Sequence, residues 1–138
     1  MSESIRDVMT RNPRTLAASS STVEAARAMR DEDVGLIPIV EGDRLVGTVS
    51  DRDIALRVVA EGKTADAVQV GEVASRELVT IDPGQDLDEA LRLMATHQVR
   101  RLPVVDEDGK LIGIVAQADV VKHATSKQAG DVVEKISK

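Results

Sequence analysis

Cysteine and all three aromatic residues are missing from the 138 residues of this sequence. The absence of cysteine excludes disulfide bonds and metal sites built from thiolates. The absence of phenylalanine, tyrosine and tryptophan removes the rings on which single-stranded bases stack, so nucleic-acid binding of that kind is not expected. Any base that this chain binds must therefore lie between aliphatic side chains.

A surplus of positive charge and long hydrophobic runs are missing too. The 18 Lys and Arg residues against 24 Asp and Glu residues give a net charge of -6, which argues against a basic nucleic-acid surface. No apolar run approaches the roughly 20 residues that span a bilayer. The first residues, 1–4, lack a basic region followed by an apolar core. We expect a soluble, cytoplasmic protein that binds neither nucleic acid nor a membrane.

Metal-binding and catalytic patterns are equally scarce. Two histidines are present, His97 and His123, each near the end of a predicted helix and without a second histidine at ligand spacing. The acidic run 106–109 is interpreted as a hairpin turn, because Val115 stands where a calcium loop needs glutamate. No nucleophile elbow, phosphate-binding loop or Ser/His/Asp order is visible. We predict no metal site and no catalytic residue, so the chain is not expected to be an enzyme.

What the sequence does contain is an internal repeat. A shift of 65 residues, which becomes 66 after a turn that is one residue longer, superposes identical residues in the two halves. The pairs include Glu24 and Glu89, Ala25 and Ala90, Pro38 and Pro103, Gly47 and Gly113, and Asp53 and Asp119. We predict repeats at residues 5–62 and 63–125, and a tail at residues 126–138 that forms a short amphipathic helix.

Both repeats have the same predicted order of elements, β-α-β-β-α, in a mixed α/β (α+β) class. The first helix takes its N-cap from residues 20–22 in one repeat and from Asp86 in the other. Leu87, Leu91 and Met94 form an apolar stripe that is typical of a core-facing helix. The other predicted elements are extended pieces at 15–16 and 78–81, hairpins at 36–40 with 45–49 and 102–105 with 111–115, and last helices at 51–60 and 117–124.

Two features of these elements have consequences for packing. Pro38 and Pro103 interrupt the first strand of each hairpin, so a backbone group beside each proline is expected to be free for something other than a sheet neighbour. In the last helix of the first repeat, the spacing of the apolar residues predicts one buried face. Its residues are Ile54, Ala55, Val58 and Val59.

The sequence Gly47 to Asp53 runs from a strand into the first turn of that helix, and it has two interpretations. Ser50 and Asp53 can form a capping box in which each side chain satisfies the backbone amide of the other residue. Alternatively, helix amides and the Ser50 hydroxyl bind an anion while the Asp53 carboxylate binds both hydroxyls of a ribose. In the second repeat, Ala116 has lost the hydroxyl but Asp119 keeps its carboxylate. Capping alone therefore explains the aspartate at position 119 poorly. Common ancestry of the two repeats is an alternative explanation, in which Asp119 is kept without a role.

The ordered motifs of the two halves resemble a pair of CBS domains, the module named after cystathionine β-synthase. They are VMT, EAARAM, LIPIV and LVGTVSDRDI in the first repeat, and EVAS, DEALRLM and RRLPVVDEDGKLIGIVAQADV in the second. The resemblance extends from Ile5 to about Ala124 and is strongest to small stand-alone bacterial pairs. It implies two repeats packed with pseudo-two-fold symmetry around clefts that bind adenosyl compounds in many members of the family.

The resemblance also implies roles for individual residues. Gly47, Ser50 and Asp53 match the family motif in full, so Asp53 would hold the ribose hydroxyls and Ser50 the ribose or phosphate. Residues near Thr15, Ile37 and Pro38 would line the adenine. In the second repeat the motif departs from the family pattern at Ala116. The possible second site there comprises Val79, Leu102, Pro103 and Asp119.

Phosphates need positive charge, and Arg100 and Arg101 stand before the second hairpin where the first repeat has Gly35 and Leu36. In family members with this pattern such an arginine often reaches a phosphate. Arg101 is therefore the first candidate, followed by Arg100 and Arg52. The alternative is that these arginines are solvated charges at a strand edge that discourage aggregation.

The leading hypothesis is a non-catalytic sensor that binds AMP, ADP or ATP between the repeats and requires no cofactor. S-adenosylmethionine is a less favoured ligand. A homodimer is expected, because a pair of small repeats does not cover all its apolar helices, and an unidentified protein partner is possible. The alternative is a structural or interaction protein that acts through its dimer surface and has vestigial clefts. An enzyme acting on a nucleotide is the least favoured hypothesis.

Overall fold

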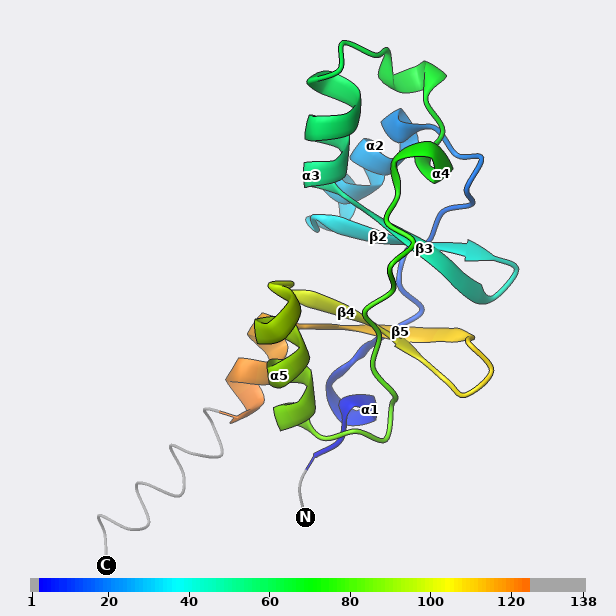
Figure 1. Ribbon diagram of the computed structural model, residues 1–138. Coiled ribbons are helices and arrows are strands. Elements are labelled where there is room, and N and C mark those ends of the chain that lie inside the picture. The colour runs from blue at the N-terminus through cyan, green and yellow to red at the C-terminus, as the bar shows by residue number, and fades with distance from the viewer. Residues whose placement is uncertain (1–2, 125–138) are drawn as a thin grey trace, which may run out of the picture. The chain divides into compact units, whose positions relative to one another are not determined.

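The computed structural model describes residues 3–124, which divide into two compact units (Figure 1). We call them the α2 unit and the α5 unit after the longest helix in each. The α2 unit comprises residues 12–78 and 107–111. The α5 unit comprises residues 3–11, 79–106 and 112–124. The predicted helix in the tail at 126–138 lies outside the described residues.

The α2 unit is built on an antiparallel hairpin of strands β2 and β3 covered by short helices. Its elements are α2 (Thr22–Glu32), β2 (Leu36–Glu41), β3 (Arg44–Ser50), α3 (Asp51–Ile54), the π-helix η1 (Ala55–Val59), the 3₁₀-helix η2 (Ala65–Ala67) and α4 (Val70–Val73). The hairpin register pairs Ile37 with Val49, and a bulge shifts it between Ile39 and Val40. Ile37, Ile39 and Val49 are all buried, so the inner face of the hairpin forms the core of this unit.

The α5 unit repeats this plan with an added edge strand. Its elements are α1 (Ile5–Val8), β1 (Thr10–Arg11), α5 (Leu87–His97), β4 (Arg101–Val105) and β5 (Leu111–Ala116), and residues 117–124 are helical. The sheet order is β1-β5-β4, with β1 antiparallel to β5. Both predicted hairpins and both long helices are thus confirmed, as is the mixed class of the fold.

Each short helix that opens a sequence repeat packs in the compact unit of the other repeat. Ile5 of α1 is fully buried with Met94 of α5, as Figure 1 shows by the position of α1 beside α5. Val70 of α4 is fully buried in the α2 unit, and its amide donates to the Ser20 carbonyl over 2.8 Å. The compact units therefore divide the chain differently from the predicted repeats at 5–62 and 63–125, because the two leading apolar helices are exchanged.

The predicted extended pieces lie beside the proline-containing strands. Leu16 forms a parallel bridge with Ile39, and Ile81 forms the equivalent bridge in the α5 unit. The Leu16 amide donates to the Pro38 carbonyl, and the Ile81 amide donates to the Pro103 carbonyl, each over 3.1 Å. The expectation of a free backbone group beside each proline is therefore wrong for these carbonyls. The missing proline amides are tolerated because the bridge on that side uses the carbonyls and needs no proline donor.

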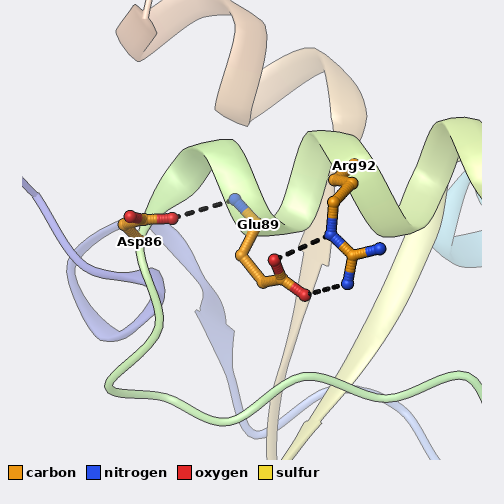
Figure 2. A network of polar contacts seen from close by, with 3 residues as sticks. All are labelled: Asp86, Glu89 and Arg92. Carbon is orange, nitrogen blue, oxygen red and sulfur yellow. Dashed lines mark hydrogen bonds and ion pairs between the residues drawn. The ribbon is translucent and has the colours of Figure 1, made fainter.

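Side-chain caps begin both long helices. Ser21 accepts a hydrogen bond from the Glu24 amide over 3.1 Å, and Asp86 accepts one from the Glu89 amide over 2.9 Å. These are the caps that the sequence predicts, and they satisfy amides that have no partner within the helix. Figure 2 shows the second cap together with two hydrogen bonds from the Arg92 guanidinium to the Glu89 carboxylate.

The predicted buried face of the last helix in the first repeat is correct at only two positions. Val58 is fully buried and Ile54 is half-buried, but Ala55 is exposed and Val59 keeps 69% of its surface. The reason is the π-helical turn, in which the Ala60 amide donates to the Ala55 carbonyl five residues earlier. This wider turn changes the spacing of residues that share a face, so an α-helical period misplaces the apolar stripe.

No helix between residues 3 and 124 combines the length and the apolar character that a membrane span requires.

Candidate functional site

The Ser50 and Asp53 side chains form a reciprocal capping box at the start of α3. The Asp53 amide donates to the Ser50 hydroxyl over 3.0 Å, and the Ser50 amide donates to Oδ2 of Asp53 over 2.9 Å. The hydroxyl and one carboxylate oxygen therefore have partners inside the chain. The capping interpretation of this motif is confirmed.

The remaining amides at this helix start are also paired. The Asp51 amide donates to the Gly35 carbonyl over 2.9 Å, and the Arg52 amide donates to Oδ1 of Asp51 over 2.8 Å. All four amides from Ser50 to Asp53 thus have protein acceptors. The expectation that they are open to an anion is wrong for this structure, because none is left to donate. Positive charge for a phosphate has to come from side chains.

The Asp53 carboxylate nevertheless keeps unused acceptor capacity. Its Oδ1 atom has no hydrogen-bond partner within residues 3–124, and the residue is half-buried. A carboxylate has two oxygens and about four acceptor positions, of which the Ser50 amide occupies one. Asp53 is therefore both a cap and a fixed, partly accessible acceptor for neighbouring hydroxyl groups.

The residues predicted to line a base differ in how much of them is accessible. Thr15 is half-buried directly before the Leu16 bridge. Ile37 keeps only 1% of its surface and belongs to the core of the α2 unit. Pro38 is buried, and its carbonyl is bonded to the Leu16 amide. The side chain of Ile37 is thus committed to the core.

The second motif has a different local structure. Ala116 has no hydroxyl to cap the helix at 117–124, and the Gln117 amide donates to the Arg100 carbonyl over 2.7 Å. Asp119 is exposed, and its carboxylate forms no hydrogen bond or ion pair within the described residues. The other predicted members of this site are less accessible than Asp119: Val79 is half-buried, and Leu102 and Pro103 are buried.

The three candidate arginines differ in their exposure and in the unit to which they belong. None of Arg52, Arg100 and Arg101 uses its side chain in an ion pair or hydrogen bond in the part of the chain that the structure describes. Arg52 and Arg100 are exposed, and Arg101 is half-buried at the start of β4. Arg52 belongs to the α2 unit with Asp53, whereas Arg100 and Arg101 belong to the α5 unit.

Two structural contacts near this region are not evident from the sequence. The Arg57 guanidinium donates to the Val73 carbonyl over 3.0 Å and so connects η1 with the end of α4. The α2 unit also contains a cavity beside β2, β3 and α4. The sequence does contain an indication of that cavity, because Gly71 and Ala74 are small whereas the first repeat has Arg6 and Met9 at the equivalent positions.

The chain contains two compact units, each built on a hairpin that leads into a helix, and this arrangement defines the class of the protein. The family model for the CBS domain matches residues 5–60 and 70–126, so the chain belongs to the CBS domain family. The CBS domain-containing protein YhcV of Bacillus subtilis is 43% identical over 135 residues, which cover 97% of this chain and 95% of that protein.

Solved structures show the same fold. A crystal structure of Hypoxic Response Protein I with two coordinated zinc ions has a TM-score of 0.81 and 35% identity, covering 88% of this chain and 98% of that one. A crystal structure of CBSX2 in complex with AMP has a TM-score of 0.77 and 30% identity, covering 91% and 98%. Within residues 3–124 of this chain, no group of three or more His, Cys, Asp or Glu side chains is arranged to hold a metal ion.

Proposed function

We propose that this chain is a non-catalytic regulatory module that binds an adenine nucleotide, AMP, ADP or ATP, at the Ser50–Asp53 motif. The observation that carries the proposal is the Asp53 carboxylate, which the Ser50 amide orients and which keeps Oδ1 available. A ribose presents two adjacent hydroxyl donors, and a fixed carboxylate is a suitable acceptor for both. The AMP complex of the similar CBSX2 supports this ligand class.

Arginine side chains supply the charge that phosphates need in this proposal. The helix amides at 50–53 are already paired. Arg52 is the candidate from the same unit, and its guanidinium is exposed and unpaired among the described residues. Arg101 remains the first candidate by resemblance to the family. A guanidinium binds phosphate oxygens in a bidentate manner, so its loss should weaken ATP binding more than adenosine binding.

The test compares Asp53→Asn with the unmodified chain. The asparagine carbonyl can still accept from the Ser50 amide, so the cap and the fold should survive while the charged acceptor is lost. Titration calorimetry with AMP, ADP, ATP and S-adenosylmethionine should show binding of at least one compound. The affinity should fall by about 10- to 100-fold in the variant, since a hydrogen bond to a charged group contributes about 1.5–3 kcal/mol.

Asp119→Asn is the matched control, because it changes the same motif position in the other repeat, where the aspartate is exposed and its side chain has no hydrogen bond within residues 3–124. It should leave the strongest nucleotide affinity unchanged. Saturation of the unmodified protein at about 100 times the dissociation constant should raise its unfolding free energy by roughly 2.7 kcal/mol. Absence of any such increase with all four compounds would remove the proposal.

An interaction protein with vestigial clefts is the second candidate function. It is favoured by the apolar surface of the last helix in the first repeat, where 49% of the surface of Leu56 and 69% of the surface of Val59 are exposed. Such a surface is suited to covering by a second copy in a homodimer. This candidate predicts a dimer in light scattering that Leu56→Glu disrupts and that nucleotides do not affect. A nucleotide-dependent change in assembly would contradict it.

A further inference from the structure

The α2 unit contains a cavity of about 210 Å³ that is separate from the Ser50–Asp53 motif. Apolar and small residues form most of its wall, and two charged residues complete it. The lining residues are Ala18, Ile39, Glu41, Val46, Gly47, Gly71, Ala74 and Arg76. Pockets for drug-sized ligands have volumes of roughly 300–1,000 Å³, so this space suits a molecule smaller than a nucleotide.

The other repeat shows why this space is open. Gly71 and Ala74 line the cavity, whereas Arg6 and Met9 occupy the equivalent positions of the first repeat. A Cβ atom added to Gly113 would lie 2.7 Å from the Met9 sulfur, so the Met9 side chain fills the space beside that glycine. The equivalent atom on Gly47 would lie 3.8 Å from the small Ala74 side chain. The cavity therefore results from a residue difference between the repeats.

The charged residues of the wall have no partner elsewhere in residues 3–124, and both are accessible to solvent. Glu41 and Arg76 are both exposed, so their charged groups lie at the solvent side of the cavity. Neither side chain forms an ion pair or a hydrogen bond within residues 3–124. The apolar part of the wall includes Ile39, which keeps 1% of its surface, and the half-buried Val46. An occupant should thus combine one negative group, one positive group and a short apolar body.

We propose that this cavity binds a free α-amino acid with an aliphatic side chain. Its carboxylate would pair with Arg76, its ammonium group with Glu41, and its side chain would lie against Ile39 and Val46. A zwitterion of this kind is the simplest molecule that offers a charge-assisted partner to both exposed groups and an apolar body to the buried part of the wall. The site goes beyond nucleotide binding and does not depend on it, because none of the residues 50–53 lines the cavity.

The experiment titrates the full chain with L-valine, L-leucine, L-isoleucine and L-methionine by calorimetry. At least one should bind saturably, and N-acetyl-leucine amide, which carries neither charge, should not bind. Ala74→Met introduces the residue that fills the equivalent space in the other repeat and should abolish binding. Arg76→Gln should weaken binding by about tenfold or more, since it removes a charge-assisted hydrogen bond.

The matched control is Arg11→Gln, which changes the position equivalent to Arg76 in the other repeat and should bind like the unmodified chain. Asp53→Asn should also keep amino-acid binding, which separates this result from the test of nucleotide binding. Folding of each variant is checked by circular dichroism and thermal unfolding. No binding of any of the four amino acids, or equal binding by a folded Ala74→Met variant, would overturn the proposal.

Discussion

At the scale of single residues, the two glycines at equivalent positions of the repeats are required because other backbone atoms lie close to them. A Cβ atom on Gly113 would lie 2.9 Å from the Thr10 carbonyl oxygen, and one on Gly47 would lie 3.1 Å from the Ser75 carbonyl oxygen. Thr10 lies in β1, which pairs with β5, and Ser75 forms a bridge with Thr48 of β3. Neither carbonyl can therefore move freely. Glycine at these positions therefore serves packing, whatever ligand the motif binds.

We expect Gly113→Ala to lower the unfolding free energy by about 1–3 kcal/mol, the usual cost of overpacking. The added methyl group would contact both the Thr10 carbonyl and the Met9 sulfur. Gly35→Ala is the control, because the three atoms nearest to its new methyl group all belong to the exposed Asp51 side chain, which can shift more easily than a backbone carbonyl. Urea unfolding measures both, and an equal loss in the two variants would contradict the steric explanation.

Residue chemistry also explains which interpretation of the Ser50–Asp53 motif could be reached from the sequence. The spacing of the two residues predicts a capping box and a ribose acceptor equally well, since both need an oxygen atom at each position. The structure confirms the cap. That the neighbouring amides are paired could not be predicted, because one acceptor, the Gly35 carbonyl, lies 16 positions away in the sequence.

At the scale of elements, the start of α5 combines a helix cap with an ion pair on the helix surface (Figure 2). The hydrogen bond from Arg92 holds the pKa of the Glu89 carboxyl below its ordinary value of 4.5. A carboxyl whose pKa is lowered on folding stabilises the folded state above its ordinary pKa. That contribution is lost as the pH falls through the lowered value in the folded state.

Glu89→Gln should therefore make the unfolding free energy less dependent on pH below about pH 4.5 than it is in the unmodified chain. Denaturant unfolding at a series of pH values from neutral to acidic measures this difference. Arg92→Gln is the control, because it removes the cause of the shift and should reduce the pH dependence in the same way. A variant curve parallel to that of the unmodified chain throughout this range would refute the assignment.

The helices also show where a period taken from the sequence fails. The predicted stripe on α5 is confirmed, because that helix keeps α-helical hydrogen bonds from Leu87 to His97. The same method misplaced Ala55 and Val59, because the chain changes to a π-helix at Ala55. A residue of this π-helix, Arg57, also donates to the Val73 carbonyl, a contact that the local sequence pattern does not indicate.

At the scale of the whole molecule, the exchange of α1 and α4 makes the core of each unit depend on both halves of the chain. Ile5 is fully buried among residues of the second repeat, and Val70 is fully buried among residues of the first. Neither repeat can therefore complete its core with the short helix that opens it.

Ile5→Ala should cost about 2–5 kcal/mol, as for other large-to-small changes in a core. Hydrogen exchange should become faster mainly in residues 81–106 and 112–120 of the α5 unit, and less so in residues 16–58, which belong to the same sequence repeat as Ile5. Val70→Ala is the matched control, which should shift the faster exchange to residues 16–58. If Ile5→Ala made hydrogen exchange faster only in residues 16–58, α1 would pack in its own repeat in solution, and the exchange of α1 and α4 would be contradicted.

The duplicated β-α-β-β-α order, the helix caps and the membership of the CBS domain family could be predicted from the sequence, because each depends on residues that are close together or on a pattern that occurs twice. Only the tertiary structure decided which half each leading helix completes, which amides at the motif are paired, and that Ala74 leaves a cavity where Met9 fills one. These features depend on contacts between residues far apart in the chain, and a hydrophobic period specifies that a residue is buried but not which partner buries it.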